Sequence, residues 1–181
     1  MKIILASTSP RRKELLEREG IDFIIDASSI TEYLDSSLEI EERLKKLAYD
    51  KGISIHEKYP DDVVISADTT IYHNGKIIGK AHSAHEAREI LESLSSDTHS
   101  VFTSVAVFYK DQVCTFVDET KVTFKNISDM IDDWQGKAGA YAIQGVAGKF
   151  IEEVQGDIDN VIGLPVKHVI EVIETLTKKP L

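Results

Sequence analysis

Apolar runs alternate with apolar residues at helical spacing along the first half of the chain. A short apolar run at residues 3–6 predicts a buried strand, and the β-branched run at 63–65 predicts a central strand. Between them a helix is predicted from Pro10, with Ser9 as its N-cap, followed by a short strand at 21–26. Strands that interleave with helices in this way are typical of an α/β fold.

Two more predicted helices share a start signal. Ser36 and Ser83 are each followed three residues later by a glutamate, which is the spacing of a capping box. The first box is expected to open a helix with apolar or small residues through 40–55, which Pro60 ends. The second is expected to open a helix through 87–94.

The second half of the chain is dominated by strand patterns. Asn74-Gly75, between two apolar pairs, is a strong hairpin signal. Two long, partly alternating runs at 100–109 and 113–124 predict strands joined by a turn. The remaining predicted elements are a helix from Ser128 through Trp134, a close-packed loop or short helix at 137–148, a strand at 149–154 and a last helix from Pro165. With the first half, these patterns predict a mixed sheet.

The composition limits the class of protein. Of the 181 residues, 42% are hydrophobic, so we expect one domain with a real core over residues 1–181. No apolar run approaches membrane-spanning length, and the basic-then-apolar pattern of a signal peptide is absent. A single cysteine excludes an internal disulfide framework. We therefore expect a cytoplasmic protein that is not held in a membrane.

The charge distribution points to a particular kind of ligand. A net charge of −10, from 21 basic and 31 acidic side chains, argues against general affinity for nucleic acid or anionic membranes. Arg11, Arg12 and Lys13 nevertheless crowd one predicted helix start, where free N–H groups are already positive. With the hydroxyls of Ser7 and Ser9, this turn suits a phosphate chain. A solvated basic helix start is the alternative interpretation.

Asp68 is the strongest single candidate for chemistry. It follows an apolar strand pattern, and open α/β sheets form their ligand crevices at strand ends. An acid so placed commonly holds Mg²⁺ or orients a water molecule, although a turn-forming Asp is the alternative. Glu32 could supply a second carboxylate ligand, but by itself it reads as one of many surface glutamates.

Two further polar residues have an ordinary and a functional interpretation. Lys51 lies in the second predicted helix, where plain solvation of the side chain is the ordinary interpretation. Gln144 lies between small residues and glycines, and its amide offers both a donor and an acceptor for reading the edge of a base. A tightly packed loop with an incidental Gln is the alternative. No Walker A loop or Gly-x-Gly-x-x-Gly fingerprint is present, so any phosphate site is built differently.

Five phrases follow one another along nearly the whole chain: Ser7-Thr8-Ser9-Pro10-Arg11-Arg12, Leu47-Ala48-Tyr49-Asp50-Lys51, Ser66-Ala67-Asp68-Thr69, Gly139-Ala140-Tyr141-Ala142-Ile143-Gln144-Gly145 and the closing segment 156–165, which we expect to be mainly structural. In this order they resemble the motifs of the Maf family of nucleoside triphosphate pyrophosphatases. Two positions depart from the family. Gly52 replaces the usual Ala and is expected to loosen or end the helix, and Ala81 replaces the Pro after Lys80 and is expected to soften that loop.

The resemblance implies a fold and a reaction. The fold is α/β of the Maf/inosine-triphosphatase type, a mixed twisted sheet with flanking helices and two lobes around a deep cleft, often in a homodimer. The reaction is hydrolysis of a nucleoside triphosphate between the α and β phosphates, with a divalent metal, Mg²⁺ or Mn²⁺. Asp68 would act as general base or metal ligand, and Glu32 would help to hold the metal. The residues that would neutralise charge on the phosphates are Ser7, Ser9, Arg12, Lys51 and Lys80.

The resemblance also implies a substrate preference. Arg11, Thr69 and Gln144 together resemble the subgroup that hydrolyses dTTP and UTP, with modified pyrimidine triphosphates as further substrates. The subgroup that prefers 7-methyl-GTP departs from this trio and is the first alternative. A nucleotide-binding regulator of septum formation that needs no turnover is the second, and a nucleic-acid-binding protein, which the acidity disfavours, is the third.

Overall fold

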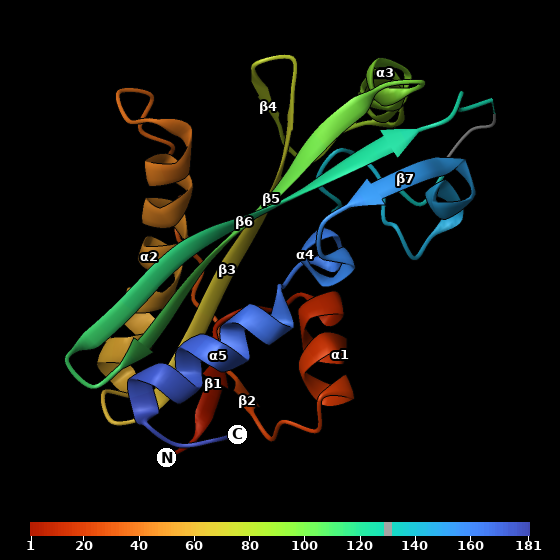
Figure 1. Ribbon diagram of the computed structural model, residues 1–181. Coiled ribbons are helices and arrows are strands. Elements are labelled where there is room, and N and C mark those ends of the chain that lie inside the picture. Colours follow the sequence, from red (N-terminus) through yellow and green to blue (C-terminus); the bar gives the residue numbers. More distant parts are fainter. Residues whose placement is uncertain (129–131) are drawn as a thin grey trace. The chain divides into compact units, whose positions relative to one another are not determined.

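The computed structural model describes residues 1–128 and 132–181, and over these ranges a seven-stranded sheet is flanked by helices (Figure 1). In chain order the elements are β1 (Ile3–Leu5), α1 (Pro10–Arg18), β2 (Ile24–Ile25), α2 (Ile40–Lys58), β3 (Val63–His73), β4 (Lys76–Ile78), α3 (Ala84–Leu94), β5 (Thr98–Tyr109), β6 (Gln112–Phe124), the 3₁₀ helix η1 (Val146–Phe150), β7 (Ile151–Gln155), α4 (Ile158–Ile162) and α5 (Val166–Thr177).

The sheet contains both parallel and antiparallel pairs. Its strand order is β2-β1-β3-β5-β6-β7, with β4 paired to β3. β1 runs parallel to β2 and β3, whereas β3 with β4 and β6 with β7 are antiparallel. The predicted mixed sheet with flanking helices is therefore confirmed.

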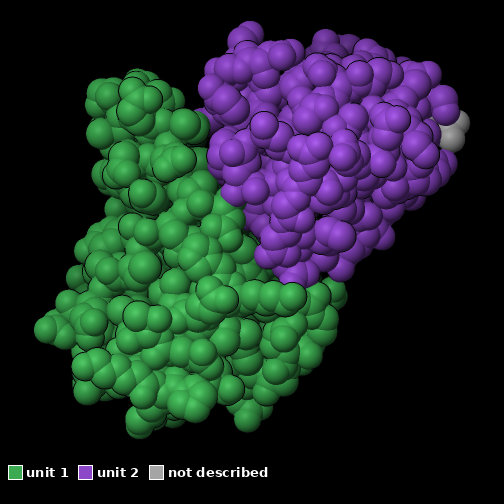
Figure 2. Space-filling view, viewed as in Figure 1, with its two compact units in different colours: residues 1–68, 103–118, 163–181 green, residues 69–102, 119–162 purple. Residues whose placement is uncertain are grey.

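The chain divides into two compact units (Figure 2). Unit 1 comprises Met1–Asp68, Thr103–Asp118 and Gly163–Leu181, and unit 2 comprises Thr69–Phe102 and Glu119–Ile162. Strands β3, β5 and β6 contribute residues to both units. The deep cleft and the single domain over residues 1–181 stay predictions.

In unit 1, helix α2 packs its small and apolar face on the sheet. Ala48 and Ile55 of α2 lie in one buried cluster with Ala6, which directly follows β1, and with residues of β1, β3 and β5, namely Ile4, Val64, Ala106 and Phe108. The Ser66 hydroxyl of β3 donates to the carbonyl of Ala48 at 2.6 Å. The expectation that Gly52 ends the helix is wrong, because α2 continues to Lys58 and Gly52 is buried.

Gly52 is the point of closest approach between α2 and the sheet. A Cβ at this position would lie 2.5 Å from Cε2 of Phe108 and would also overlap the Ser66 hydroxyl. The hydroxyl is held by its hydrogen bond to Ala48, and the Phe108 ring is stacked on His56 with centroids 5.1 Å apart. Neither neighbour can move away without losing a contact, so glycine here permits close packing.

Replacing Gly52 with alanine should therefore lower the free energy of unfolding. Overpacking a core typically costs about 1–3 kcal/mol, whereas the better helix propensity of alanine returns about 1 kcal/mol at most. We expect a net loss of about 1–2 kcal/mol in urea denaturation. Gly79→Ala is the matched control, because nothing lies within 4 Å of the added Cβ. Equal stabilities of the two variants would contradict this account.

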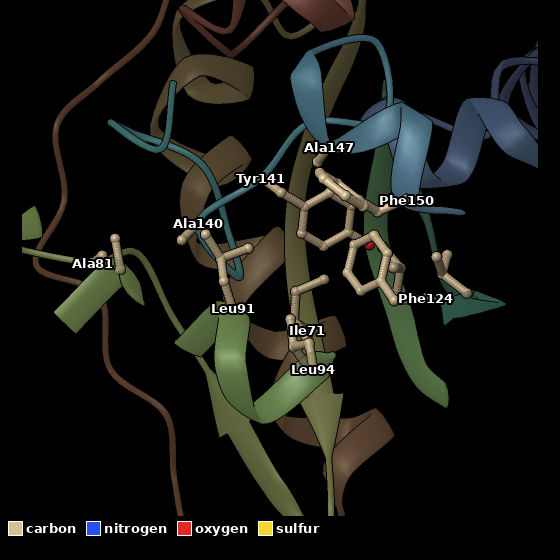
Figure 3. Close-up of a cluster of buried hydrophobic side chains, with 12 residues drawn as sticks. Ile71, Ala81, Leu91, Leu94, Phe124, Ala140, Tyr141, Ala147 and Phe150 are labelled. Atoms are coloured by element: carbon tan, nitrogen blue, oxygen red, sulfur yellow. The ribbon is translucent and has the colours of Figure 1, made fainter. Parts of the chain in front are cut away.

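In unit 2, the core forms between α3, the sheet and the loop before η1 (Figure 3). The buried cluster includes Ile71 of β3, Leu91 and Leu94 of α3, Phe124 of β6 and Tyr141 of the loop. The Tyr141 and Phe124 rings meet edge to face with centroids 4.9 Å apart. The loop is thus part of the core of this unit and not merely a connection across its surface.

Several local predictions are confirmed. Ser9 is the N-cap of α1, where its hydroxyl accepts from the Arg12 backbone N–H, and Ser83 caps α3 by accepting from the N–H of Glu86. The β3–β4 hairpin turns at Asn74 and Gly75, whose φ values of 50° and 75° are those of a tight hairpin turn.

Two local predictions are wrong. α2 begins at Ile40 with Glu39 as N-cap and no side-chain capping bond, whereas Ser36 lies in a preceding turn. In that turn Asp35 accepts from the backbone N–H and the hydroxyl of Ser37, so the chain is stabilised before the expected cap. β3 does not end before Asp68 but continues to His73, so Asp68 lies in the middle of a strand.

Other predicted elements differ in length from the observed ones, or fall on residues that the structure does not describe. The strand expected over 21–26 is reduced to Ile24–Ile25, and α4 has no counterpart among the predicted elements. The helix expected from Ser128 falls on residues 129–131, which lie outside the described residues, and 132–134 are not helical. Over residues 1–128 and 132–181, no helix combines the length and apolar composition that crossing a membrane requires.

Candidate functional site

The start of α1 holds Arg12 in a fixed position. The Ser7 hydroxyl accepts from Nη1 of Arg12 at 3.1 Å and from the backbone N–H of Ser9 at 3.2 Å. Nε of Arg12 donates to the carbonyl of Gly163 at 2.7 Å. Gly163 belongs to the closing segment expected to be mainly structural, so that segment also orients a candidate site residue.

The Arg12 guanidinium shares an electrostatic environment with both candidate carboxylates. Loss of solvation on burial lowers the pKa of Arg12, the charges of Asp68 and Glu32 oppose this shift, and the neighbouring Arg11 adds to it. The guanidinium nevertheless stays protonated, because its pKa starts so far above neutrality. The basic helix start and the two acidic residues thus belong to one site.

Lys51 joins the two carboxylates. Its Nζ lies 2.6 Å from Oδ1 of Asp68 and 2.8 Å from Oε1 of Glu32. The side chains of Lys51 and Asp68 are 19% and 16% exposed, whereas that of Glu32 is 55% exposed. Two carboxylate oxygens therefore converge on a single cation from different parts of the chain. The plain solvation considered for Lys51 is wrong.

This arrangement suits a divalent cation shared with a phosphate ligand. Mg²⁺ prefers carboxylate and phosphate oxygens and keeps several water ligands. In the part of the chain that the structure describes, no group of three or more His, Cys, Asp or Glu side chains could hold a metal ion. Glu32 and Asp68 would each supply one ligand to the cation and leave its remaining positions to water and phosphate.

Close packing behind the site places Lys51 opposite Asp68. Ser66 lies two residues before Asp68 in β3, and Gly52 follows Lys51 in α2. The Ser66 hydroxyl bond to Ala48 and the close approach at Gly52 fix the distance between helix and strand. The sequence showed both residues, but no local pattern indicated that they position the lysine.

Lys80 and the glycine-rich loop are linked through their backbones in unit 2. Lys80 forms an isolated antiparallel bridge with Ala138, and the N–H of Gly139 donates to the carbonyl of Gly79 at 3.2 Å. The Lys80 side chain is exposed, whereas Ala81 is buried. These backbone contacts tie the segment around Ala81, where the family has a proline, to the glycine-rich loop. The greater flexibility expected from the missing proline stays a prediction.

The loop that carries Gln144 follows a strained turn. Gly139 and Ala140 have φ values of 64° and 62°, in the left-handed region that favours glycine. A Cβ on Gly139 would lie 2.7 Å from Cγ1 of Ile71, so the loop backbone sits directly on β3. Gln144 itself is exposed. Its amide is therefore accessible to a ligand.

Tyr141 of this loop ends on a buried histidine. Its hydroxyl lies 2.6 Å from Nε2 of His99 in β5, and only 2% of His99 is exposed. Burial lowers the pKa of His99 from the usual 6.5 to about 4, with a further lowering by the charge of His73 and an opposing effect of Asp97. Burial also raises the pKa of Tyr141, so the phenol stays protonated.

His99 should make the stability of the protein depend on pH. The unfolded chain takes up a proton on this residue near pH 6.5, whereas the folded protein does so near pH 4. Stability is therefore complete above pH 6.5 and is lost as the pH falls towards 4, by about 3 kcal/mol in total. Urea denaturation across this range should show the loss, and His99→Gln should reduce it. Parallel pH profiles for wild type and variant would exclude His99 as the source.

The candidate site residues are divided between the two units, and most of them lie in unit 1. Asp68 and Thr69 are neighbours in β3, so their side chains point to opposite faces of the sheet. The candidates in unit 1 are Ser7, Ser9, Arg11, Arg12, Glu32, Lys51 and Asp68, and those in unit 2 are Thr69, Lys80 and Gln144.

Known proteins are similar to this chain along nearly its whole length. A protein of Pyrococcus abyssi named dTTP/UTP pyrophosphatase is 42% identical over 179 residues, which is 95% of both chains. Proteins of the same name from Pyrococcus furiosus and Bacillus cereus are each 39% identical, over 96% and 93% of this chain and 94% and 92% of their own.

A solved structure supports the fold, and a family profile identifies the chain. The Ham1 protein of Staphylococcus aureus is similar with a TM-score of 0.50 and 14% identity, covering 98% of both chains, which supports the predicted fold class. The profile described as Maf-like protein matches residues 2–176. With four in ten residues shared with its relatives and motifs spread over both units, the chain belongs to the family of Maf-like proteins.

Proposed function

We propose that this protein is a nucleoside triphosphate pyrophosphatase that hydrolyses dTTP and UTP to the nucleoside monophosphate and diphosphate. The observation that carries the proposal is the convergence of Lys51, Asp68 and Glu32 beside Arg12. Cations and carboxylates in one site can bind a phosphate chain and activate water together. The relatives named dTTP/UTP pyrophosphatase support the same reaction.

Glu32 and Asp68 are the residues that would hold a divalent metal, Mg²⁺ or Mn²⁺. Their oxygens already converge on one cation, the Lys51 ammonium. When bound, such a metal neutralises charge on the phosphates and orients their oxygens. Lys51 would then be free to contact the phosphates itself.

The chain's own groups account for the remaining steps. Arg12, with the backbone N–H groups at the start of α1, would bind phosphate oxygens, and Ser7 keeps the guanidinium in place. The Asp68 carboxylate would take a proton from the attacking water. The water oxygen would then bond to the phosphorus on one side of the α–β bridge while the bond from that phosphorus to the bridging oxygen breaks, so that monophosphate and pyrophosphate separate. Ser9 and Lys80 complete the proposed set of phosphate contacts.

The proposed preference for pyrimidines rests on Arg11, Thr69 and Gln144. Of the three, Gln144 has the side chain whose donor and acceptor suit a base edge, and it is exposed. The proposal also places the enzyme in the cytoplasm, where nucleoside triphosphates are made. A homodimer stays a prediction.

The test is product analysis over a panel of nucleotides. Purified protein with Mg²⁺ or Mn²⁺ should convert dTTP and UTP to monophosphate and pyrophosphate, and should act much less on CTP, GTP and 7-methyl-GTP. Release of inorganic phosphate in place of pyrophosphate would contradict the proposed bond cleavage. Preference for 7-methyl-GTP would overturn the substrate but keep the reaction, and binding without turnover would favour a regulator.

A further inference from the structure

In the loop that carries Gln144, the large buried side chain nearest to that glutamine is Tyr141, which can act as its anchor. Tyr141 is 5% exposed, while Ala142 and Ile143 are half-buried and Gln144 is exposed. The next fully buried residue is Ala147, in η1. The two residues between Tyr141 and Gln144 are too few to absorb a change at the anchor. The position of Gln144 therefore depends on that of Tyr141.

The partner of the Tyr141 hydroxyl belongs to a central strand. His99 lies near the start of β5, which pairs with β3 and β6 in the sheet. The rings of His99 and Phe124 are 5.3 Å apart, and Tyr141 meets both of them edge to face, at 5.5 and 4.9 Å. Figure 3 shows the Tyr141 ring beside that of Phe124. The hydroxyl thus ends on a rigid part of unit 2.

Tyr141 is the one hydrogen-bond partner of the His99 side chain among the described residues. Over residues 1–128 and 132–181, its other ring nitrogen, Nδ1, is buried and has no hydrogen-bond partner. Burying a polar atom without a hydrogen-bond partner costs stability, so a histidine at this core position is less stabilising than an apolar side chain of similar size. The contact that it does make, to Tyr141 at 2.6 Å, is the one that a leucine or phenylalanine could not replace.

The backbone before Tyr141 is held as well. Gly139 is pressed against Ile71 and donates to the carbonyl of Gly79. Further on, the N–H of Gly145 donates to the carbonyl of Ala142 at 3.0 Å, which closes a turn around Gln144. This bond holds the turn closed, and the hydrogen bond between Tyr141 and His99 orients the turn against the core.

We propose that Tyr141 and His99 are positioning residues for base recognition, which hold Gln144 at the height and angle at which its amide reads a pyrimidine. This proposal rests on the proposed function. It assigns neither residue a contact with the phosphates or with the reacting atoms. Their removal should therefore change how the enzyme chooses a base while the chemical step stays as it was.

The first variant is Tyr141→Phe, which keeps the ring and removes only the hydroxyl. We expect KM for UTP and dTTP to rise about fivefold, as loss of one hydrogen bond predicts, with kcat within about twofold of wild type. The preference for UTP over CTP in kcat/KM should fall by a similar factor. Inhibition by inorganic tripolyphosphate, which has no base, should be unchanged. An unchanged UTP/CTP preference would overturn the proposal.

Two histidine variants and one control separate positioning from general stability. His99→Leu should reproduce the effect of Tyr141→Phe, and His99→Gln, whose amide can still reach the phenol, should restore most of the base preference. Thr120→Val is the control, because the buried Thr120 hydroxyl donates to the carbonyl of Asp157, a residue outside the loop that carries Gln144. It should lower the melting temperature without changing the UTP/CTP ratio; an equal change in that ratio would overturn the proposal.

The same assay distinguishes a failure of the proposed function from a failure of the positioning roles. A wild-type enzyme that does not hydrolyse UTP would refute the proposed function. A wild-type enzyme that prefers UTP, with variants that keep this preference in full, would refute only the roles of Tyr141 and His99.

Discussion

Replacing Asp68 with asparagine should reduce kcat for UTP by about 10³-fold or more, because the amide can neither accept the proton of the attacking water nor carry a charge. The change preserves size, and Asp68 lies in the middle of β3 with most of its side chain covered. The variant should therefore fold. Pyrophosphate release under saturating UTP and metal measures the effect.

Asp118→Asn is the matched control for Asp68→Asn. Asp118 also lies in unit 1, and its carboxylate contacts Nδ1 of His168 at 2.9 Å. Both variants lose one negative charge and one partner of a basic side chain. We expect near-normal turnover from the control. Residual activity of Asp68→Asn within tenfold of wild type would show that the carboxylate is not the base.

Replacing Lys51 with methionine should have two opposite effects. Turnover should fall by about 10²- to 10³-fold, because a cation that contacts the phosphates is lost. In the absence of nucleotide, however, the protein should bind Mn²⁺ about tenfold more tightly, since the ammonium no longer competes for the oxygens of Asp68 and Glu32. Calorimetric titration of Mn²⁺ into the protein alone measures the second effect.

Lys46→Met is the control for Lys51→Met. Lys46 lies on the same helix and pairs with Asp50 at 2.7 Å on the exposed side. The Lys46→Met substitution removes the same charge from α2 and leaves the two candidate metal ligands unchanged. If Lys51→Met lost turnover while its Mn²⁺ affinity stayed at the level of the control, the lysine would act on phosphate alone. The metal would then bind elsewhere.

Local features of the fold could be predicted because their causes are local. The N-caps at Ser9 and Ser83 are hydrogen bonds to residues three positions on, and the hairpin at Asn74-Gly75 needs only two residues that accept positive φ. The mixed sheet follows from the order of such signals along the chain. These features hold wherever the segment is placed in the protein.

The wrong predictions concern places where a second local interaction, or pairing within the sheet, outweighed the sequence pattern. Ser36 has the spacing of a capping box, but the Asp35 side chain stabilises a turn at Ser37, and the helix begins later. β3 continues past Asp68 because its later residues pair with β4, with Ile71 opposite Ile78. Strand ends are set by available partners, which a single segment does not reveal.

Residue types and short spacings were enough to predict the family, most of the strands and helices in their order, and the polar residues that are candidates for chemistry. They do not predict which of these residues meet, because tertiary packing sets those contacts. Lys51 and Asp68 are 17 positions apart, His99 and Tyr141 are 42 apart, and Arg12 and Gly163 are 151 apart. Such contacts depend on how the whole chain packs, at points as specific as the missing Cβ of Gly52 beneath Ser66 and Phe108.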